Sequence, residues 1–186
     1  TEFDVSQGAG AIRDSDIVLF VVPSTLEHDL TRDVVTHFTT DENALCIYVT
    51  VAKPSRTVER SFTDAGANTD NIFYIDCATA LTGTSMKRAG NVVYLKPSDL
   101  TQLSIALTNV VDELPAEREG ILMFDTLSTL TIYNNAETVS QFAHKLLSRI
   151  RNWPVTGFVF TVDEETDDVI KSRLTQFSDR TIEIEA

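Results

Sequence analysis

The sequence predicts an α/β fold in which a mostly parallel sheet of about seven strands lies between two layers of helices. Strand-like apolar runs alternate with segments of helical periodicity along nearly the whole chain. Most of these runs lack polar–apolar alternation, as is typical of parallel strands buried on both faces. With 186 residues and 42% hydrophobic residues, the chain can form a three-layer core in a single domain over 1–186.

The first half of the chain is expected to supply four strands. Ser24 and Glu27 form an S-x-x-E pattern directly after the first strand, which predicts a capping box at the start of a helix. A second helix is expected to end at Gly66. Segment 77–91 has no clear period and is expected to be a mobile loop, a type of segment that is often functional. The strands are expected at 16–22, 45–51, 72–75 and 92–95.

The second half is expected to add three helices and three strands. A regular apolar stripe predicts a helix between Pro97 and Pro115, and Asn135 or its neighbour is expected to cap the next helix. A third helix follows a run of acidic residues near 163–168. The strands are expected at 121–124, 158–162 and 181–184.

The charge of the chain is strongly negative. Fifteen Lys and Arg residues face 28 Asp and Glu residues, which gives a formal net charge of −13. Such a surface repels phosphate backbones and anionic lipids, so neither nucleic acid nor membrane is expected as a partner. The acidic, lysine-poor composition is typical of proteins from salt-in halophiles, in which salt screens the self-repulsion. A halophilic source is therefore a hypothesis from composition.

Other sequence features favour a cytoplasmic protein. No apolar run is long enough to cross a bilayer, and residues 1–10 lack the pattern of a secretion signal. Cys46 and Cys77 lie in separate apolar runs, with neither a C-x-x-C partner nor a nearby His. We expect both to be buried free thiols in a reducing compartment.

Residues 120–130 contain the strongest candidate for a functional position. Four apolar residues lead into Asp125 and then into a turn rich in hydroxyl groups. A parallel strand would place Asp125 at its carboxyl end, where ligands of open α/β sheets bind. In nucleotide-hydrolysing folds an acid here holds Mg²⁺ directly or through water. In the alternative interpretation, Asp125 accepts local backbone N–H groups at the end of the strand.

Two further sets of polar residues do not form recognisable sites. The run Asp163–Asp168 has enough carboxylates for a cation, but it lacks the spacing and the glycine of a calcium loop. Acids at the start of a helix are already favoured by the helix dipole. His28, His37 and His144 lie on expected helices without partners at useful spacing, so we predict neither a catalytic triad nor a zinc site.

Four segments in this order resemble the RecA superfamily, and within it the archaeal KaiC-like branch. Residues 121–128 (ILMFDTLS) resemble the Walker B strand, and residues 46–51 resemble the strand that usually carries the catalytic glutamates. Residues 157–162 resemble the strand after the Walker B helix, and residues 178–184 resemble the closing strand. The resemblance covers roughly the whole chain and implies a RecA-like fold.

Two departures from the family pattern bear on activity. A P-loop requires G-x-x-x-x-G-K-S/T, but residues 22–27 contain no Gly and no Lys. Pro23 removes a backbone donor, and Glu27 adds a negative charge where the triphosphate would lie. The glutamate pair of the family is replaced by Ala52 and Lys53. Loss of a general base typically costs about 10²–10⁴-fold in rate.

The resemblance and its departures together imply a pseudo-ATPase with no catalytic residue and no bound metal. The expected role is a regulatory or protein-interaction module that binds a protein partner or homologous RecA-like subunits, with self-assembly as one option. The alternative is a nucleotide-binding sensor with a weak ATP and Mg²⁺ site at Ser24, Thr25, Asp125 and Thr126, and little or no hydrolysis. A receiver or flavin domain is disfavoured because the first strand is followed by neither an acidic pair nor a glycine-rich loop.

Two basic positions each have two open interpretations. Lys53 could form an ion pair with Asp125 in place of a lost Mg²⁺, or it could be a solvated loop lysine. Residues 86–88 (Met-Lys-Arg) form the basic patch of the expected loop. They could contact an acidic partner or a neighbouring subunit, or they could simply be solvated.

Overall fold

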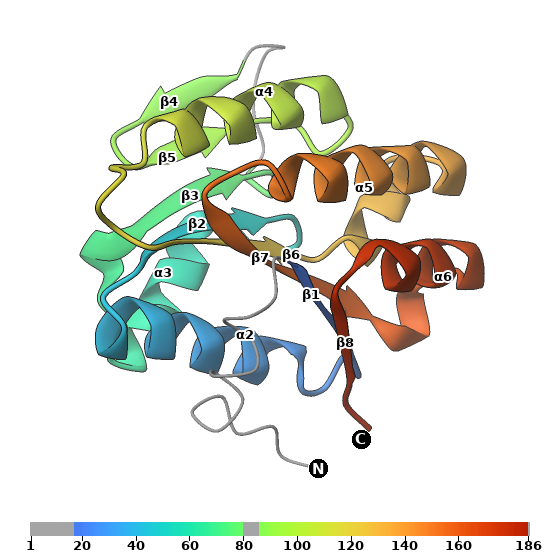
Figure 1. The fold of residues 1–186 in the computed structure, drawn as a ribbon, viewed down its shortest axis with the longest axis horizontal. Helices are drawn as coiled ribbons and strands as arrows, with labels where there is room; N and C mark the ends of the chain where they lie inside the picture. The colour runs from blue at the N-terminus through green and yellow to red at the C-terminus, as the bar shows by residue number, and fades with distance from the viewer. Residues whose placement is uncertain (1–16, 80–85, 186) are drawn as a thin grey trace.

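The computed structural model describes residues 17–79 and 86–185, which form an eight-stranded sheet with helices on both faces (Figure 1). The strand order is β4-β5-β3-β2-β6-β7-β1-β8, and every neighbouring pair is parallel except β4 and β5. The predicted αβα fold class is confirmed, with one more strand than expected. The strands are β1 (Ile17–Val22), β2 (Leu45–Thr50), β3 (Ile72–Asp76), β4 (Lys87–Ala89), β5 (Val92–Tyr94), β6 (Gly120–Asp125), β7 (Val155–Val162) and β8 (Arg180–Glu183).

The helices divide between the two faces of the sheet, with α2 and α3 on one face and α4, α5 and α6 on the other (Figure 1). Short helical turns, η1 to η4, connect some of these elements. The long helices are α2 (Glu27–Thr36), α3 (Ser55–Asp64), α4 (Leu100–Asp112), α5 (Ala136–Ile150) and α6 (Asp168–Phe177). The short turns are η1 (His37–Asp41), η2 (Thr69–Asn71), η3 (Ser128–Ile132) and η4 (Asp163–Glu165).

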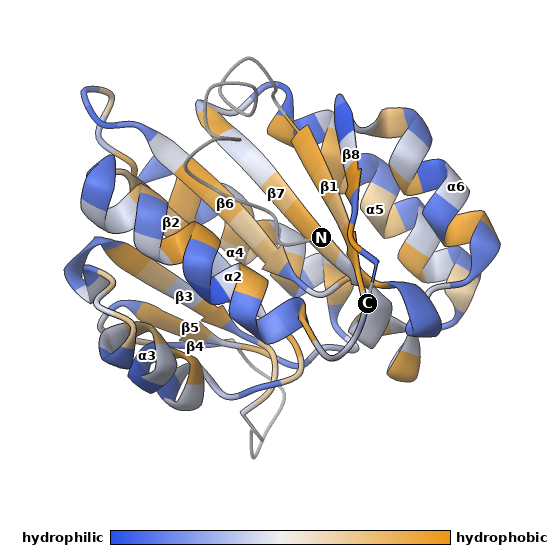
Figure 2. Ribbon diagram, turned by 90° about the horizontal axis from the view of Figure 1, so that it is seen from below, coloured by the Kyte–Doolittle hydropathy of each residue, from blue (hydrophilic) through white to orange (hydrophobic). Residues whose placement is uncertain are grey.

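The sheet separates two apolar cores. Consecutive strand residues alternate between them, so that Ile17 packs in the core beneath α4, α5 and α6, whereas Val18 packs in the core beneath α2 and α3. All six residues of β1 are buried. The inner strands β1, β2 and β6 are accordingly apolar along most of their length (Figure 2), which explains why their sequences lack polar–apolar alternation. Both thiols, Cys46 and Cys77, are free and buried, as predicted.

The carboxyl ends of the parallel strands lie along one edge of the sheet, which we call the carboxyl edge. The hydrogen-bonded ladder continues just beyond the strands there: Val51 N–H donates to the carbonyl of Asp125 at 2.9 Å. Similarly, Cys77 N–H donates to the carbonyl of Thr50 at 2.9 Å. These bonds hold the ends of β2, β3 and β6 in fixed register and so position the side chains that follow.

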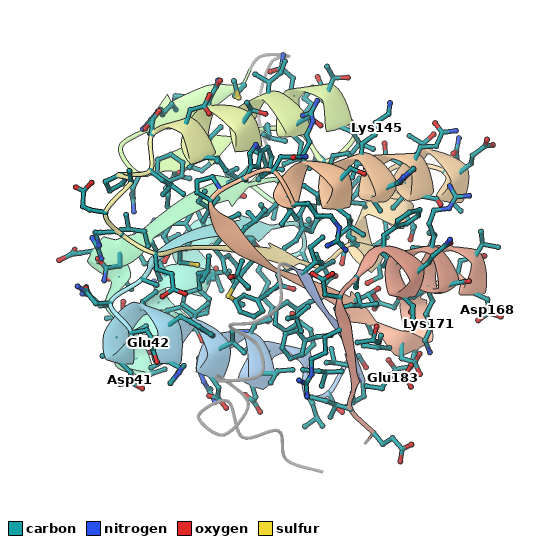
Figure 3. The ribbon with its side chains drawn as sticks, viewed as in Figure 1. Asp41, Glu42, Lys145, Asp168, Lys171 and Glu183 are labelled. Carbon is teal, nitrogen blue, oxygen red and sulfur yellow. The ribbon has the colours of Figure 1, made fainter. Side chains whose placement is uncertain are left out.

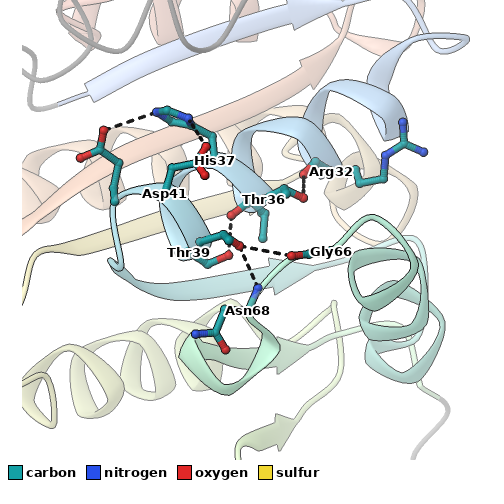
Figure 4. Close-up of polar contacts among 10 residues, drawn as sticks. Arg32, Thr36, His37, Thr39, Asp41, Gly66 and Asn68 are labelled. Atoms are coloured by element: carbon teal, nitrogen blue, oxygen red, sulfur yellow. Dashed lines mark hydrogen bonds and ion pairs between the residues drawn. The ribbon is translucent and has the colours of Figure 1, made fainter.

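At the opposite edge, polar contacts join η1, which follows α2, to the loop after α3 (Figure 4). The Thr40 hydroxyl donates to the carbonyl of Gly66 at 3.4 Å and accepts from Asn68 N–H at 3.1 Å. Gly66 has a φ of 86°, a left-handed conformation that glycine adopts without strain. α3 therefore ends beside this glycine, as the sequence predicted.

Two sequence-based expectations about local structure are wrong. The predicted capping box does not form, because α2 begins at Glu27 and has Leu26 at its N-cap, without a side-chain cap. Part of the expected loop 77–91 is instead the edge strand β4, while residues 80–85 lie outside the described residues. Arg88 of β4 donates to both carboxylate oxygens of Glu113, at 2.6 and 2.8 Å, and lies 5.0 Å from the ring centroid of Phe73. These contacts hold β4 against the sheet.

Candidate functional site

Two carboxyl groups and a tyrosine meet at the carboxyl edge, below the first turn of α2. Tyr48 lies in β2, beside β6, and its hydroxyl donates to Oδ2 of Asp125 at the end of β6. The Glu27 side chain reaches down from α2 and hydrogen-bonds to the Asp125 carboxyl group. We call Glu27 and Asp125 the acid pair. Tyr48 is 1% exposed, so water does not compete for its hydroxyl.

The acid pair holds a proton at neutral pH. Burial is the main reason that the pKa of Glu27 rises to about 9, and the hydrogen bond and negative charge of Asp125 raise it further. The positive charge of Lys53 acts in the opposite direction. Oε1 of Glu27 is buried and has no hydrogen-bond donor among the described residues. Burial and the negative charge beside it therefore keep Glu27 protonated at neutral pH.

A third carboxylate reaches the turn before α2. Ser24 N–H donates to the Glu164 carboxylate, at 3.1 Å from Oε2 and 3.3 Å from Oε1. Two further backbone donors of the turn, Leu26 and Glu27 N–H, both donate to the carbonyl of Pro23. A phosphate cradle requires several backbone N–H groups that point at the ligand, together with a Lys. A carboxylate and a carbonyl satisfy those donors here, so the residues present do not fit a magnesium–triphosphate group.

The four residues predicted for a vestigial nucleotide site lie in two different environments. Ser24 and Thr25 are exposed on the turn, and Ser24 contacts Glu164. Asp125 is half-buried in the acid pair. Thr126 follows a cis peptide bond, is 3% exposed, and contacts the Thr129 hydroxyl at 2.7 Å. Among the described residues, no hydrogen bond joins Ser24 or Thr25 to Asp125 or Thr126. Glu27 is the residue of α2 that contacts Asp125.

Lys53 does not form the ion pair with Asp125 that one interpretation proposed. Its side chain is exposed, and within the described ranges no ion pair links the two residues. Tyr48 and Glu27 contact Asp125 instead. The physical reason is that a protonated carboxyl group and a phenol satisfy Asp125 without the burial of a lysine ammonium group.

The sequence alone did not identify Tyr48 and Glu164 as part of this site. Tyr48 lies two residues before the end of its strand, so it reaches Asp125 only because β2 pairs directly with β6. Glu164 is one of several acids in η4, and no local signal distinguishes it from its neighbours. The sequence signal that did point here was Glu27, whose charge was predicted to lie in the phosphate position.

The other acidic and histidine candidates contact neighbouring protein groups. Lys171 Nζ lies 2.8 Å from Oδ1 of Asp163, and the acids of η4 are exposed. The part of the chain that the structure describes has no group of three or more metal-ligating side chains. Nε2 of His28 lies 2.9 Å from the Ser61 hydroxyl, and the ring of His144 stacks on Phe177.

Asp76, at the end of β3, shows how the same edge stabilises an ionised acid. Its carboxylate accepts Ser55 N–H at 2.7 Å and Ala78 N–H at 2.8 Å, and Thr79 donates both its backbone N–H and its hydroxyl. Burial acts to raise the pKa of Asp76, but these hydrogen bonds outweigh burial and lower it. Asp76 therefore anchors the start of α3.

Comparison with solved structures supports the RecA-like fold. A KaiC-like protein, PH0186, of the hyperthermophilic archaeon Pyrococcus horikoshii OT3 is similar with a TM-score of 0.60 and 10% identity, over 91% of this chain and 71% of that one. A second protein of the same organism, PH0250, is similar with a TM-score of 0.58 and 12% identity, over 91% of this chain and 81% of that one. At such identities the likeness shows the fold alone.

Sequence comparison places the chain in a family. A comparison with curated proteins gives no match. No helix among the described residues is long and apolar enough to cross a membrane. The model of a family of unknown function, DUF7504, matches residues 18–184. The match spans nearly the whole chain, and the chain therefore belongs to the DUF7504 family.

Proposed function

We propose that this chain is a non-catalytic RecA/KaiC-like module that acts by binding other proteins. The observation that carries the proposal is the placement of three carboxyl groups, those of Glu27, Asp125 and Glu164, around the first turn of α2. In a nucleotide-binding member of this fold class, the phosphates would lie at the corresponding strand–helix turn. Glu27 fills this position as a neutral carboxyl group, and the negative charges of Asp125 and Glu164 would repel a triphosphate.

The surrounding groups do not offset that repulsion. Lys53 is the nearby basic residue at the end of β2, and its side chain is exposed. The strand that would supply a base to orient the attacking water is followed by Ala52 and Lys53. A site that lacks both a phosphate cradle and a general base supports neither tight binding nor hydrolysis.

The proposal is tested by measuring nucleotide binding and turnover on the same sample. Thermal melts and calorimetry with millimolar ATP or ADP and Mg²⁺ should show no shift and no heat. A ligand at 100 times its dissociation constant would add about 2.7 kcal/mol to the free energy of unfolding, which would raise Tm by several degrees. Phosphate release should stay at the level of the buffer.

The informative variants are Asp125→Ala and, as a control on a distant exposed acid, Asp112→Ala in α4. Magnesium-dependent turnover that Asp125→Ala abolishes and Asp112→Ala leaves intact would overturn the proposal. Saturable nucleotide binding without turnover would instead favour the sensor function.

A further inference from the structure

Most of the exposed large apolar side chains follow three neighbouring strands. These side chains follow β1, β6 and β7 in the sequence. Because β6, β7 and β1 are neighbours in the sheet, the side chains lie along one stretch of the carboxyl edge. Single exposed apolar residues are common on protein surfaces, but a group of them on one surface indicates an interaction site. Within the described ranges these side chains are Leu26 (37% exposed), Ile132 (72%), Tyr133 (50%) and Val169 (63%), with Ile105 (45%) lying apart on α4.

Helix packing brings three of these residues close together. α5 and α6 both start at the carboxyl edge and run parallel, and the His144 ring of α5 stacks on the Phe177 ring of α6 with centroids 4.3 Å apart. Ala136 starts α5, eight residues before His144, and Val169 of α6 lies eight residues before Phe177. Because the two helices run parallel and His144 stacks on Phe177, Val169 lies at the same height along the helices as Ala136. Ile132 and Tyr133 lie four and three residues before α5, at the end of η3. Packed helices lie about 8–10 Å apart.

We call Ile132, Tyr133 and Val169 the apolar patch. Exposed acids lie at the start of α5 and in and after η4, up to the start of α6, and neither 132–137 nor 163–168 contains a Lys or Arg. Lys171 and Asp168 both lie on α6 (Figure 3). The ammonium group of Lys171 forms an ion pair with Asp163. We call the surrounding acids the acidic rim: Glu137, Asp163, Glu164, Glu165, Asp167 and Asp168.

We propose that the apolar patch and the acidic rim bind a basic amphipathic helix of a partner protein. This inference rests on the proposed protein-binding function and names the class of partner. The apolar face of such a helix would cover the patch, and its Lys and Arg residues would face the rim. A second copy of this chain fits less well, because its net charge of −13 would oppose association. Anionic membranes are disfavoured for the same reason.

The probe is a synthetic helical peptide of Leu and Lys, about five turns long, with all Leu on one face. Fluorescence anisotropy should show saturable binding to the wild-type chain. A peptide of the same composition in scrambled order should bind at least about tenfold more weakly, because it cannot present an apolar face. Equal binding of the two peptides would overturn the proposal, since charge alone would then account for it.

Variants locate the binding surface. The triple variant Ile132→Ser, Tyr133→Ser and Val169→Ser should weaken peptide binding by about tenfold or more, whereas the matched control Ile105→Ser should leave it unchanged. Thermal melts of each variant establish that it is folded. Unchanged affinity in a folded triple variant would overturn the assignment of this patch.

A charge variant tests the acidic rim. Glu137→Gln with Asp168→Asn should lower the affinity for the peptide and reduce its dependence on salt. The control is Asp64→Asn, an exposed acid at the end of α3. An effect of equal size in the control would overturn the role of the rim.

Two further measurements separate the alternatives. Light scattering that shows self-association of the wild-type chain, lost in the triple variant, would overturn the basic-helix partner in favour of a second copy. Nucleotide turnover on the same samples tests the proposed function independently. Peptide binding by a chain that also hydrolyses ATP would support this surface and overturn only the non-catalytic function. Absence of both activities would overturn only the surface.

Discussion

Glu27 and Asp76 are acids at the same edge of the sheet whose pKa values shift in opposite directions. Burial dominates at Glu27, where the neighbouring group is another carboxyl, and the pKa rises to about 9. Burial also acts on Asp76, but donors from Ser55 and Thr79 outweigh it and the pKa falls. Burial favours the protonated form of both acids, and the donors that face Asp76 reverse that preference there.

The acid pair should make the protein less stable as pH rises. An unfolded Glu loses its proton near its ordinary pKa of 4.5, whereas folded Glu27 keeps it up to about 9. The folded state therefore binds more protons between these values, and the free energy of unfolding falls across that range as pH rises. Glu27→Gln resembles the protonated form. It should raise Tm by about 5 °C at pH 8 and little at pH 4.

Thermal melts from pH 4 to pH 9 check this prediction, with the exposed Glu117→Gln as the control. If the Tm of Glu27→Gln and wild type differed equally at both ends of the pH range, the shared proton would not be the cause.

Two buried tyrosines provide a matched pair of substitutions. Tyr48→Phe removes the hydroxyl that donates to Asp125, and we expect it to cost about 1–3 kcal/mol of stability because a half-buried acceptor loses one of its hydrogen-bond partners. Tyr74→Phe removes a buried hydroxyl that has no hydrogen-bond partner among the described residues. Tyr74→Phe should be neutral or stabilising. Urea unfolding measures both, and equal losses would contradict the assigned role of the Tyr48 hydroxyl.

Among the secondary structure elements, the starts of α2 and α5 differ in how they are stabilised. The Asn135 side chain accepts Thr138 N–H at 2.8 Å and so caps α5, as predicted. Ser24 instead uses its backbone N–H to contact Glu164, and α2 has no side-chain cap. The first turn of α2 is held by contacts with neighbouring elements, not by its own sequence.

This difference predicts unequal effects of two alanine substitutions. Asn135→Ala should cost about 1 kcal/mol, because a backbone N–H of α5 loses its acceptor. Ser24→Ala keeps the backbone N–H that contacts Glu164 and should change stability by less than about 0.5 kcal/mol. Chemical denaturation compares them directly. A larger loss for Ser24→Ala would show that the capping box predicted from the sequence forms after all.

For the whole molecule, the net charge of −13 should make stability depend on salt. The exposed acids of η4 and α6 repel one another at low ionic strength, and salt screens that repulsion. We predict that Tm rises between low and molar KCl. Sucrose, which carries no charge, serves as a control for general exclusion from the surface. A Tm that rose no more in KCl than in sucrose would count against adaptation to high salt.

The sequence by itself determined the order of strands and helices, the cap at Asn135 and the burial of both thiols. These features depend on apolar periodicity and local hydrogen bonds, which are written in neighbouring residues. It also drew attention to two residues that meet in the structure. Asp125 matches the Walker B pattern, and Glu27 departs from the P-loop pattern.

Only the tertiary structure decided what those residues contact. Tyr48 meets Asp125 because β2 pairs with β6, and Glu164 reaches Ser24 because β7 pairs with β1. The sequence did not predict the edge strand β4, because three residues are too few to show a strand pattern. Its pairing with β5 stabilises it. Pairing and register depend on residues far apart in the chain, and local sequence contains no signal that selects them.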